Sequence, residues 1–310
     1  SRWAAIKTPS PGCGWLSSVA ALPGNKAWAV GYQTNSSGIT HTLTEYYNGS
    51  AWAIEPSPNP GPTAELYSVT VTPSGTVWAA GVYYNSNGDQ ESLLLKRTGS
   101  TWTPVTAPGL ASLQGITSTP SGQLWAVGWG FNGNYLNNST VILMQTASGW
   151  KQVSSPSPGK GNGSYLYSVA AGPNNALWAV GKYYDSNTFA PHTLTVRYQS
   201  GKWTQVTSPT PGSADDWLYS VTITPSGNVW AVGGATGSQC ESNLAEEYTG
   251  GAWKVVTVPN RGTCSSNNAN ALYGVTATST GTLYTVGQSD ISTLVEQNVS
   301  GTWKIVPSDN

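Results

Sequence analysis

Apolar and polar positions alternate in short runs that return about every fifty residues along the chain. The clearest run, LYSVTVTPSGTVWAAG from Leu66, reappears as LYSVTITPSGNVWAVG from Leu218. In the first copy, 66–71 alternates and is rich in β-branched residues, 73–75 has turn-forming residues, and a second apolar run begins at Val77. The pattern predicts two antiparallel strands joined by a tight turn.

Two sequence cassettes mark every copy of the repeat. The first is an aromatic residue followed three positions later by glycine, and its aromatic residues are Trp28, Trp78, Trp125, Trp178, Trp230 and Tyr284. The second is a tryptophan with glycine shortly before it in all copies but the first and proline six positions after it in all copies but the last. Its tryptophans are Trp3, Trp52, Trp102, Trp150, Trp203, Trp253 and Trp303. By subtraction, successive members of either series are 47 to 54 residues apart, which indicates a repeat architecture.

Each copy also contains a third and a fourth strand, as at 92–96 and 102–106, joined by a second tight turn. A four-stranded sheet with apolar residues on both faces cannot bury them alone, and radial packing of neighbouring sheets solves this problem. We therefore predict an all-β fold, one β-propeller domain over 1–310 with six four-stranded blades. The predicted blades span about 13–58, 65–108, 112–156, 165–209, 217–259 and 271–307. The repeated tryptophans and glycines are predicted to pack between blades.

The second cassette occurs once more than the first, because Trp3 precedes the first complete copy. Residues 1–9 are therefore predicted to form a surplus N-terminal strand, which either adds to an edge or belongs to a longer array. Six blades are favoured, and seven are the alternative.

The connections within each copy differ in length. The turns between first and second strands and between third and fourth strands are tight, whereas the second-to-third loops and the crossings to the next copy are long and variable. Variable loops on a rigid scaffold are typical binding sites, and aromatic faces beside amides suit sugar rings and hydroxyls. The predicted ligand-binding residues are Trp129, Phe131, Tyr135, Trp217, Tyr84 and Tyr184. The alternative for such loop aromatics is to seal the ends of strands.

The same loops carry the residues that an enzyme would use. A glycosidase or lyase needs two carboxyl groups that face each other across a cleft, and the candidates are Glu91, Asp185, His192, Asp215 and Glu241. The alternative for each is a solvated loop charge or a turn cap, and the sequence contains no known catalytic motif. The adjacent Asp215 and Asp216 suggest calcium at most, since they lack the spaced oxygen pattern of a dedicated loop. No other metal and no cofactor is predicted.

Composition limits the setting and the partners. Asp, Glu, Lys and Arg make up 9% of the residues, against about 25% in typical globular proteins, which favours a secreted, extracellular protein. The 13 basic and 14 acidic residues nearly cancel, so nucleic acid is not an expected partner. No apolar run is long enough to cross a membrane.

The three cysteines lack zinc-site spacing and favour a disulfide. Cys240 and Cys264 are expected at the same end of the fifth blade and are the predicted pair. A bridge between Cys13 and Cys264 is the alternative, and spacing does not decide between them.

The copies of WAVG at 28–31 and of PSPNPG at 56–61, with NGSAW at 48–52, resemble a family of secreted bacterial repeat propellers that is largely uncharacterised. The resemblance covers nearly the whole chain and implies a propeller outside the cell, but no catalytic residue. A more distant likeness is to Asp-box propellers such as sialidases. The aspartate of that box is missing here, because Tyr47 and Arg97 stand at its position.

These observations favour a non-enzymatic extracellular propeller that recognises glycans or another cell-surface or matrix partner through its long-loop end. The first alternative is a polysaccharide-active enzyme that uses loop carboxylates. The second is a structural or assembly protein.

Overall fold

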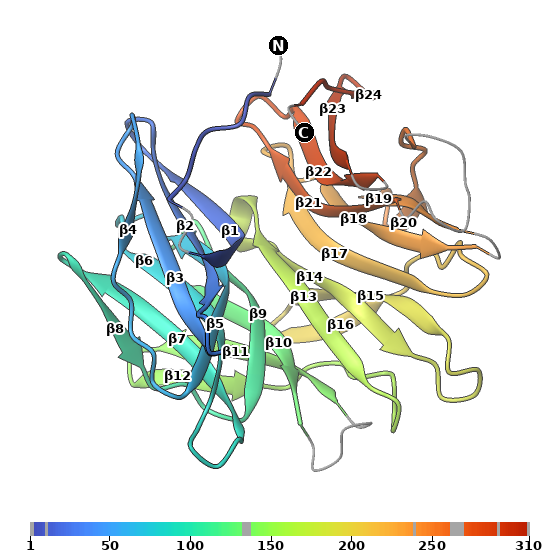
Figure 1. Ribbon diagram of the computed structural model, residues 1–310. Coiled ribbons are helices and arrows are strands. Elements are labelled where there is room, and N and C mark those ends of the chain that lie inside the picture. The colour runs from blue at the N-terminus through green and yellow to red at the C-terminus, as the bar shows by residue number, and fades with distance from the viewer. Residues whose placement is uncertain are drawn as a thin grey trace. The chain divides into compact units, whose positions relative to one another are not determined.

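The computed structural model describes residues 3–9, 12–131, 138–237, 240–260, 270–289 and 292–308. The described residues form six four-stranded antiparallel sheets, and in each sheet the strands pair in chain order (Figure 1). This confirms the predicted all-β fold, a β-propeller with six four-stranded blades. The chain divides into two compact units with three blades each.

The N-terminal unit comprises Ile6–Gly133 and Thr140–Ser154. Its first blade consists of β1 (Cys13–Leu22), β2 (Lys26–Thr34), β3 (Thr40–Tyr47) and β4 (Trp52–Glu55). Its second blade consists of β5 (Thr63–Val71), β6 (Val77–Tyr84), β7 (Gln90–Thr98) and β8 (Thr101–Val105). Its third blade consists of β9 (Ala111–Ser118), β10 (Leu124–Gly130), β11 (Ser139–Thr146) and β12 (Gly149–Val153).

The C-terminal unit comprises Ser155–Asn310 together with the short segments Ser1–Ala5 and Asn134–Ser139. Its first blade, the fourth of the chain, consists of β13 (Ser164–Ala171), β14 (Leu177–Tyr184), β15 (Pro191–Gln199) and β16 (Lys202–Val206). The fifth blade consists of β17 (Asp216–Ile223), β18 (Val229–Thr236), β19 (Glu241–Thr249) and β20 (Ala252–Val255). The sixth blade consists of β21 (Asn270–Ala277), β22 (Leu283–Ser289), β23 (Ser292–Val299) and β24 (Thr302–Ile305).

The two tryptophan series meet between blades, as predicted. In each unit, the second-strand tryptophan of one blade packs edge-on against the fourth-strand tryptophan of the next. The ring centroids are 5.3 Å apart for Trp28 and Trp102, 5.7 Å for Trp78 and Trp150, 5.3 Å for Trp178 and Trp253, and 5.6 Å for Trp230 and Trp303. Because large rings with edge-to-face geometry contribute strongly to packing, these pairs stabilise the contacts between blades.

The repeated glycine is explained by a β-bulge in the first strand of every blade, and not by packing between blades. In β13 the pairing shifts between Leu166 and Ser168, so that Tyr167 is an extra residue, and the Tyr165 carbonyl is pushed onto Gly181. A Cβ on Gly181 would lie 1.9 Å from that carbonyl oxygen. The same bulge and the same close approach recur in all six blades. Only glycine therefore fits at this position.

A serine after the bulge links successive blades within each unit. Its hydroxyl oxygen accepts a backbone N–H from the first strand of the next blade. The pairs are Ser18 with Val69 (3.3 Å), Ser68 with Ile116 (3.1 Å), Ser168 with Val221 (3.3 Å) and Ser220 with Val275 (3.2 Å). The last blade of each unit has glycine instead, Gly115 and Gly274, and cannot donate or accept through a side chain there.

The N-terminal segment differs from the predicted surplus strand. Residues 3–9 form no strand and join none of the six sheets. Instead, the Trp3 ring packs edge-on against Tyr284 with centroids 5.8 Å apart. The Trp3 amide also donates to the carbonyl of Pro307 at 3.0 Å. Trp3 thus gives the sixth blade an aromatic contact like the one that the first, second, fourth and fifth blades take from their successors.

The Trp3 contact predicts a measurable stability effect. Trp3→Ala is expected to lower the free energy of unfolding of the C-terminal unit by about 1 kcal/mol, a modest cost because Trp3 remains 45% exposed. The measurement is urea unfolding followed by tryptophan fluorescence. Ile6→Ala is the control in the same segment, since Ile6 is 61% exposed. Equal unfolding midpoints for the two variants would contradict the proposed role of Trp3.

Equivalent first-strand residues differ in exposure between the first and second blades. Leu66 and Val69 of the second blade pack against the first blade and are 0% and 6% exposed. The equivalent residues of the first blade, Leu16 and Val19, are 41% and 64% exposed.

Candidate functional site

The bulged residues of the C-terminal unit form a continuous row of tyrosines. Tyr167, Tyr219 and Tyr273 are the extra residues of β13, β17 and β21. Their ring centroids are 5.7 Å apart for the first pair and 5.2 Å for the second. The equivalent residues of the N-terminal unit are Ser17, Tyr67 and Gln114, so the row is specific to the C-terminal unit.

The tyrosine hydroxyls stay protonated across the physiological range. Burial, followed by the neighbouring Tyr273 and Glu241, raises the pKa of Tyr219 to about 12. Burial, followed by the Glu241 charge, also raises the pKa of Tyr273. The row therefore presents neutral hydroxyls that both donate and accept hydrogen bonds, with Glu241 close to two of them.

Beside this row, three aromatic rings surround the ammonium group of Lys182. Its Nζ lies 5.1 Å from the ring centroid of Tyr184, 5.6 Å from that of Trp217 and 5.9 Å from that of Tyr165. The Tyr165 hydroxyl accepts a hydrogen bond from the Asn138 side-chain amide at 2.9 Å. In the described part of the chain, no carboxylate forms an ion pair with Lys182. We call these rings, with the tyrosine row and Lys182, the aromatic cluster.

Asp216 holds the crossing that leads into the strand bearing Trp217. It is 1% exposed, and its two carboxylate oxygens accept the Gly212 amide at 3.0 and 2.9 Å. Burial raises its pKa to about 6, against the lowering effects of this hydrogen bond and of His192, while Asp215 raises it. Asp216 is therefore engaged in holding the backbone.

The carboxylate candidates have separate surroundings. Asp185 caps its own turn, because it accepts the Asn187 amide at 2.9 Å and the Thr188 amide at 3.0 Å. These backbone hydrogen bonds lower the pKa of Asp185. His192 stacks on Tyr183 at 5.5 Å. In the N-terminal unit, Glu91 accepts the Asn85 side-chain amide at 3.4 Å.

The aromatic candidates divide between the two units. Tyr184 and Trp217 belong to the aromatic cluster. Tyr84 is 37% exposed at the end of β6 in the N-terminal unit, where Trp129 and Phe131 also lie with ring centroids 6.4 Å apart. Tyr135 lies outside the described residues. The sequence analysis missed Tyr165, Tyr167, Lys182, Tyr219 and Tyr273, although the Leu-Tyr-Ser triplet repeated in the first strands at 166–168 and 218–220 was a signal for two of them.

Cysteine, metal and membrane predictions have partial answers. Cys13 is a free, exposed thiol, which argues against a bridge between Cys13 and Cys264. Cys264 lies outside the described residues, so its pairing with Cys240 stays a prediction.

The described residues contain no cluster of three or more His, Cys, Asp or Glu side chains that could hold a metal ion. They also contain no helix long and apolar enough to span a membrane.

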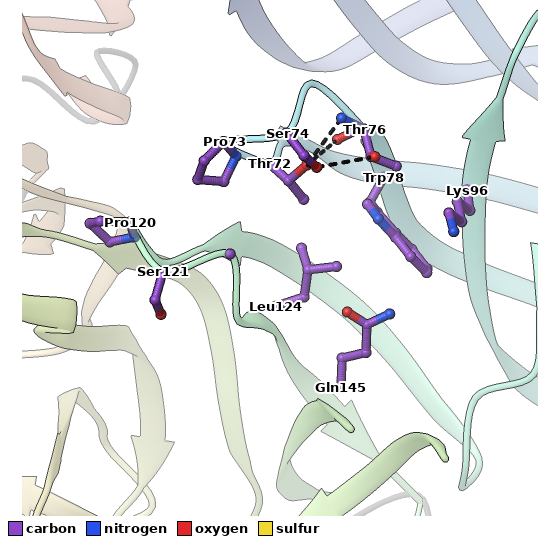
Figure 2. A pocket seen from close by; sticks show the side chains of 11 residues that line it. Thr72, Pro73, Ser74, Thr76, Trp78, Lys96, Pro120, Ser121, Leu124 and Gln145 are labelled. Carbon is purple, nitrogen blue, oxygen red and sulfur yellow. Dashed lines mark hydrogen bonds between the residues drawn. The ribbon is translucent and has the colours of Figure 1, made fainter. Parts of the chain in front are cut away.

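A cavity lies at the opposite end of the blades from the predicted binding loops. It is formed in the N-terminal unit by the short turns of the second and third blades and has a volume of about 400 Å³ (Figure 2). Its lining includes Thr72, Ser74, Trp78, Lys96 and Gln145. The end of the blades that carries the short turns therefore also contains a cavity, although loop length predicted binding sites only at the end with the long loops.

Comparison with known proteins supports the fold alone. No protein-family model matches the chain, and no curated protein does. Among solved structures, YCF48 bound to D1 peptide is 14% identical with a TM-score of 0.59, over 99% of this chain and 87% of that one. The Hadza microbial sialidase Hz136 is 10% identical with a TM-score of 0.61, over 96% of this chain and 65% of that one. A triple arginine mutant of AofleA from Arthrobotrys oligospora is 12% identical with a TM-score of 0.55, over 94% and 84%.

Proposed function

We propose that the protein is a non-enzymatic binding propeller whose aromatic cluster holds a saccharide. The observation that carries the proposal is the packing of three rings around Lys182, next to a row of tyrosines with neutral hydroxyls. Ring faces pack on the apolar C–H surfaces of a sugar, while hydroxyl and ammonium groups bond to its hydroxyls. Half-buried rings are also partly ordered before binding, which reduces the entropic cost of association.

The alternative of an enzyme has less support among the described residues. Its candidate Asp185 is engaged by its own turn, where it accepts the backbone amides of Asn187 and Thr188. The likeness to a sialidase is at 10% identity and concerns the fold. We therefore favour binding without turnover.

We also propose that the protein acts outside the cell. The low fraction of charged residues, 9%, and the abundance of neutral polar residues support this location. A surface of this kind binds neutral hydroxyl-rich polymers with little electrostatic repulsion.

The test is a glycan array followed by titration calorimetry on the sugars that bind. Trp217→Ala is expected to weaken binding at least about tenfold, because loss of a stacking ring costs on the order of 1.4 kcal/mol. Phe189→Ala is the matched control in the same unit, since Phe189 is 67% exposed and lies outside the aromatic cluster. Unchanged affinity in Trp217→Ala, or release of a cleaved product, would refute the proposal. A peptide array distinguishes protein ligands, because one similar structure is a peptide complex.

A further inference from the structure

The short-turn cavity continues into a groove on the N-terminal unit. The 400 Å³ cavity is lined by residues of the second and third blades, from Thr72 to Gln145. A second cavity of about 310 Å³ extends along the second blade and shares Ser74, Thr76 and Lys96 with the first. Lys96 therefore lines both cavities, and Figure 2 shows its side chain beside Trp78. We call the two neighbouring cavities together the short-turn groove.

The positive charge of Lys96 has no carboxylate partner among the described residues. Its Nζ lies 5.5 Å from the ring centroid of Trp78, and no carboxylate in the described chain pairs with it. The adjacent Arg97 differs, because its guanidinium pairs with Glu55 at 3.1 Å and stacks over Trp28 at 4.5 Å. The groove thus contains one uncompensated cation on an aromatic support, next to an arginine that is already neutralised.

Hydroxyl groups on the turn from β5 to β6 form the wall next to Lys96. The Thr72 and Ser74 hydroxyls are 2.8 Å apart, and Thr72 Oγ1 accepts the Thr76 amide at 3.0 Å. These contacts fix the turn, and Gly75 supplies the left-handed residue it needs with φ of 83°. Since each hydroxyl has one donor and two acceptor positions, the turn keeps hydrogen-bonding capacity for a ligand.

The fifth blade has the same turn with the opposite charge. Thr224 and Ser226 repeat the hydroxyl pair at 2.9 Å. The residue paired with the blade tryptophan there is Glu247, opposite Trp230, where the second blade has Lys96 opposite Trp78. The turn alone is therefore a feature of the repeat. The second blade combines it with a cavity and with a lysine that has no carboxylate partner among the described residues.

We propose that the short-turn groove is a second binding site, which takes an acidic saccharide. The carboxylate or sulfate of one sugar unit pairs with Lys96, and its hydroxyls bond to the turn hydroxyls and to the Gln145 amide. An anion is favoured because Lys96 has no carboxylate partner among the described residues. Neighbouring hydroxyls favour a sugar over a simple ion, and the groove beyond Lys96 provides space for a second unit.

The experiment titrates the protein with three disaccharides of the same linkage, which are sulfated, uronate-containing and neutral, and follows binding by calorimetry. The acidic sugars are expected to bind, and their affinity is expected to fall as sodium chloride rises. Lys96→Gln is expected to weaken binding at least about tenfold, whereas Lys96→Arg retains it. Preference between the sulfated and the uronate sugar identifies the anion.

Matched variants separate this site from others. Ser74→Ala is expected to weaken binding about threefold or more, and Ser226→Ala in the fifth blade is expected to have no effect. Trp217→Ala leaves this affinity unchanged, so the short-turn groove and the aromatic cluster are tested independently. Equal binding of the neutral disaccharide, no binding of any of the three, or unchanged affinity in Lys96→Gln would overturn the proposal.

Discussion

Gly181→Ala is expected to destabilise the C-terminal unit by at least about 3 kcal/mol, which is at the severe end for a single methyl group. The added Cβ would lie 1.9 Å from the Tyr165 carbonyl oxygen, 2.8 Å from its carbon and 2.9 Å from the Leu166 Cα. All three are backbone atoms of a paired strand, so none moves without breaking the sheet register. The alanine variant relieves the clash only by losing the bulge.

The measurement is the free energy of unfolding from denaturant titration, with circular dichroism as the readout. Gly237→Ala is the control in the same unit, because a Cβ there meets only the Cys240 carbonyl oxygen at 3.7 Å, an ordinary contact. The control is expected to lie within about 0.5 kcal/mol of the parent protein. A Gly181→Ala variant as stable as the control would show that the close approach is not required.

The same substitution has a consequence for the aromatic cluster. The bulge makes Tyr167 the extra residue of β13, and Tyr167 is the first member of the tyrosine row. Without the bulge, the residues on one side of it change faces, because side chains alternate along a strand. The repeated glycine therefore supports both the blade and the proposed binding surface.

The blades were predictable from the sequence because the two cassettes recur about every fifty residues. The β-bulge was not predictable. The fifty-residue period and the paired cassettes require neighbouring strands and predict the tryptophan contacts, such as Trp28 with Trp102. Around Tyr167 the sequence still reads as an alternating strand, and only the pairing of Leu166 and Ser168 with β14 reveals the extra residue. Register is a property of two strands and does not appear in one.

The candidate sites were predictable only in part for the same reason. Tyr184 and Trp217 were recognised as loop-end aromatics, but Lys182 joins them through contacts between two blades. The short-turn groove was missed because loop length was the criterion, and the cavity depends on Lys96 and Gln145 from third strands. Side-chain placement across blades, not loop length, determines both surfaces.

Buried glutamates in third strands provide the second prediction with a large effect. Glu246 pairs with Ala231 at the position that Leu95 and Val196 occupy in other blades. It is 0% exposed, and neither carboxyl oxygen has a hydrogen-bond partner among the described residues. Burial, with a further contribution from the Asp216 charge, raises its pKa to about 8. Glu246 is therefore protonated in the folded protein at neutral pH.

Stability is consequently expected to fall as pH rises. The folded pKa of Glu246 lies above the ordinary value of 4.5, so between pH 4.5 and about 8 the native state binds more protons than the unfolded state. The stabilisation present at acid pH is lost progressively over this window. Glu296 acts in the same direction, since burial raises its pKa to about 7 against a hydrogen bond from Thr285.

Glu246→Gln is expected to remove most of this pH dependence. The amide has the size and polarity of the neutral carboxyl group but does not ionise, so the variant should match the parent protein near pH 5. At pH 9 it should be more stable by roughly 2–4 kcal/mol, the order of magnitude that the pKa rise implies. Unfolding titrations from pH 5 to 9 measure the difference, with Glu247→Gln as the control on the opposite face of β19. Parallel stability curves for Glu246→Gln and the parent protein would show that Glu246 ionises without penalty, and that the unpartnered carboxyl group in the fifth blade is not what limits stability at alkaline pH.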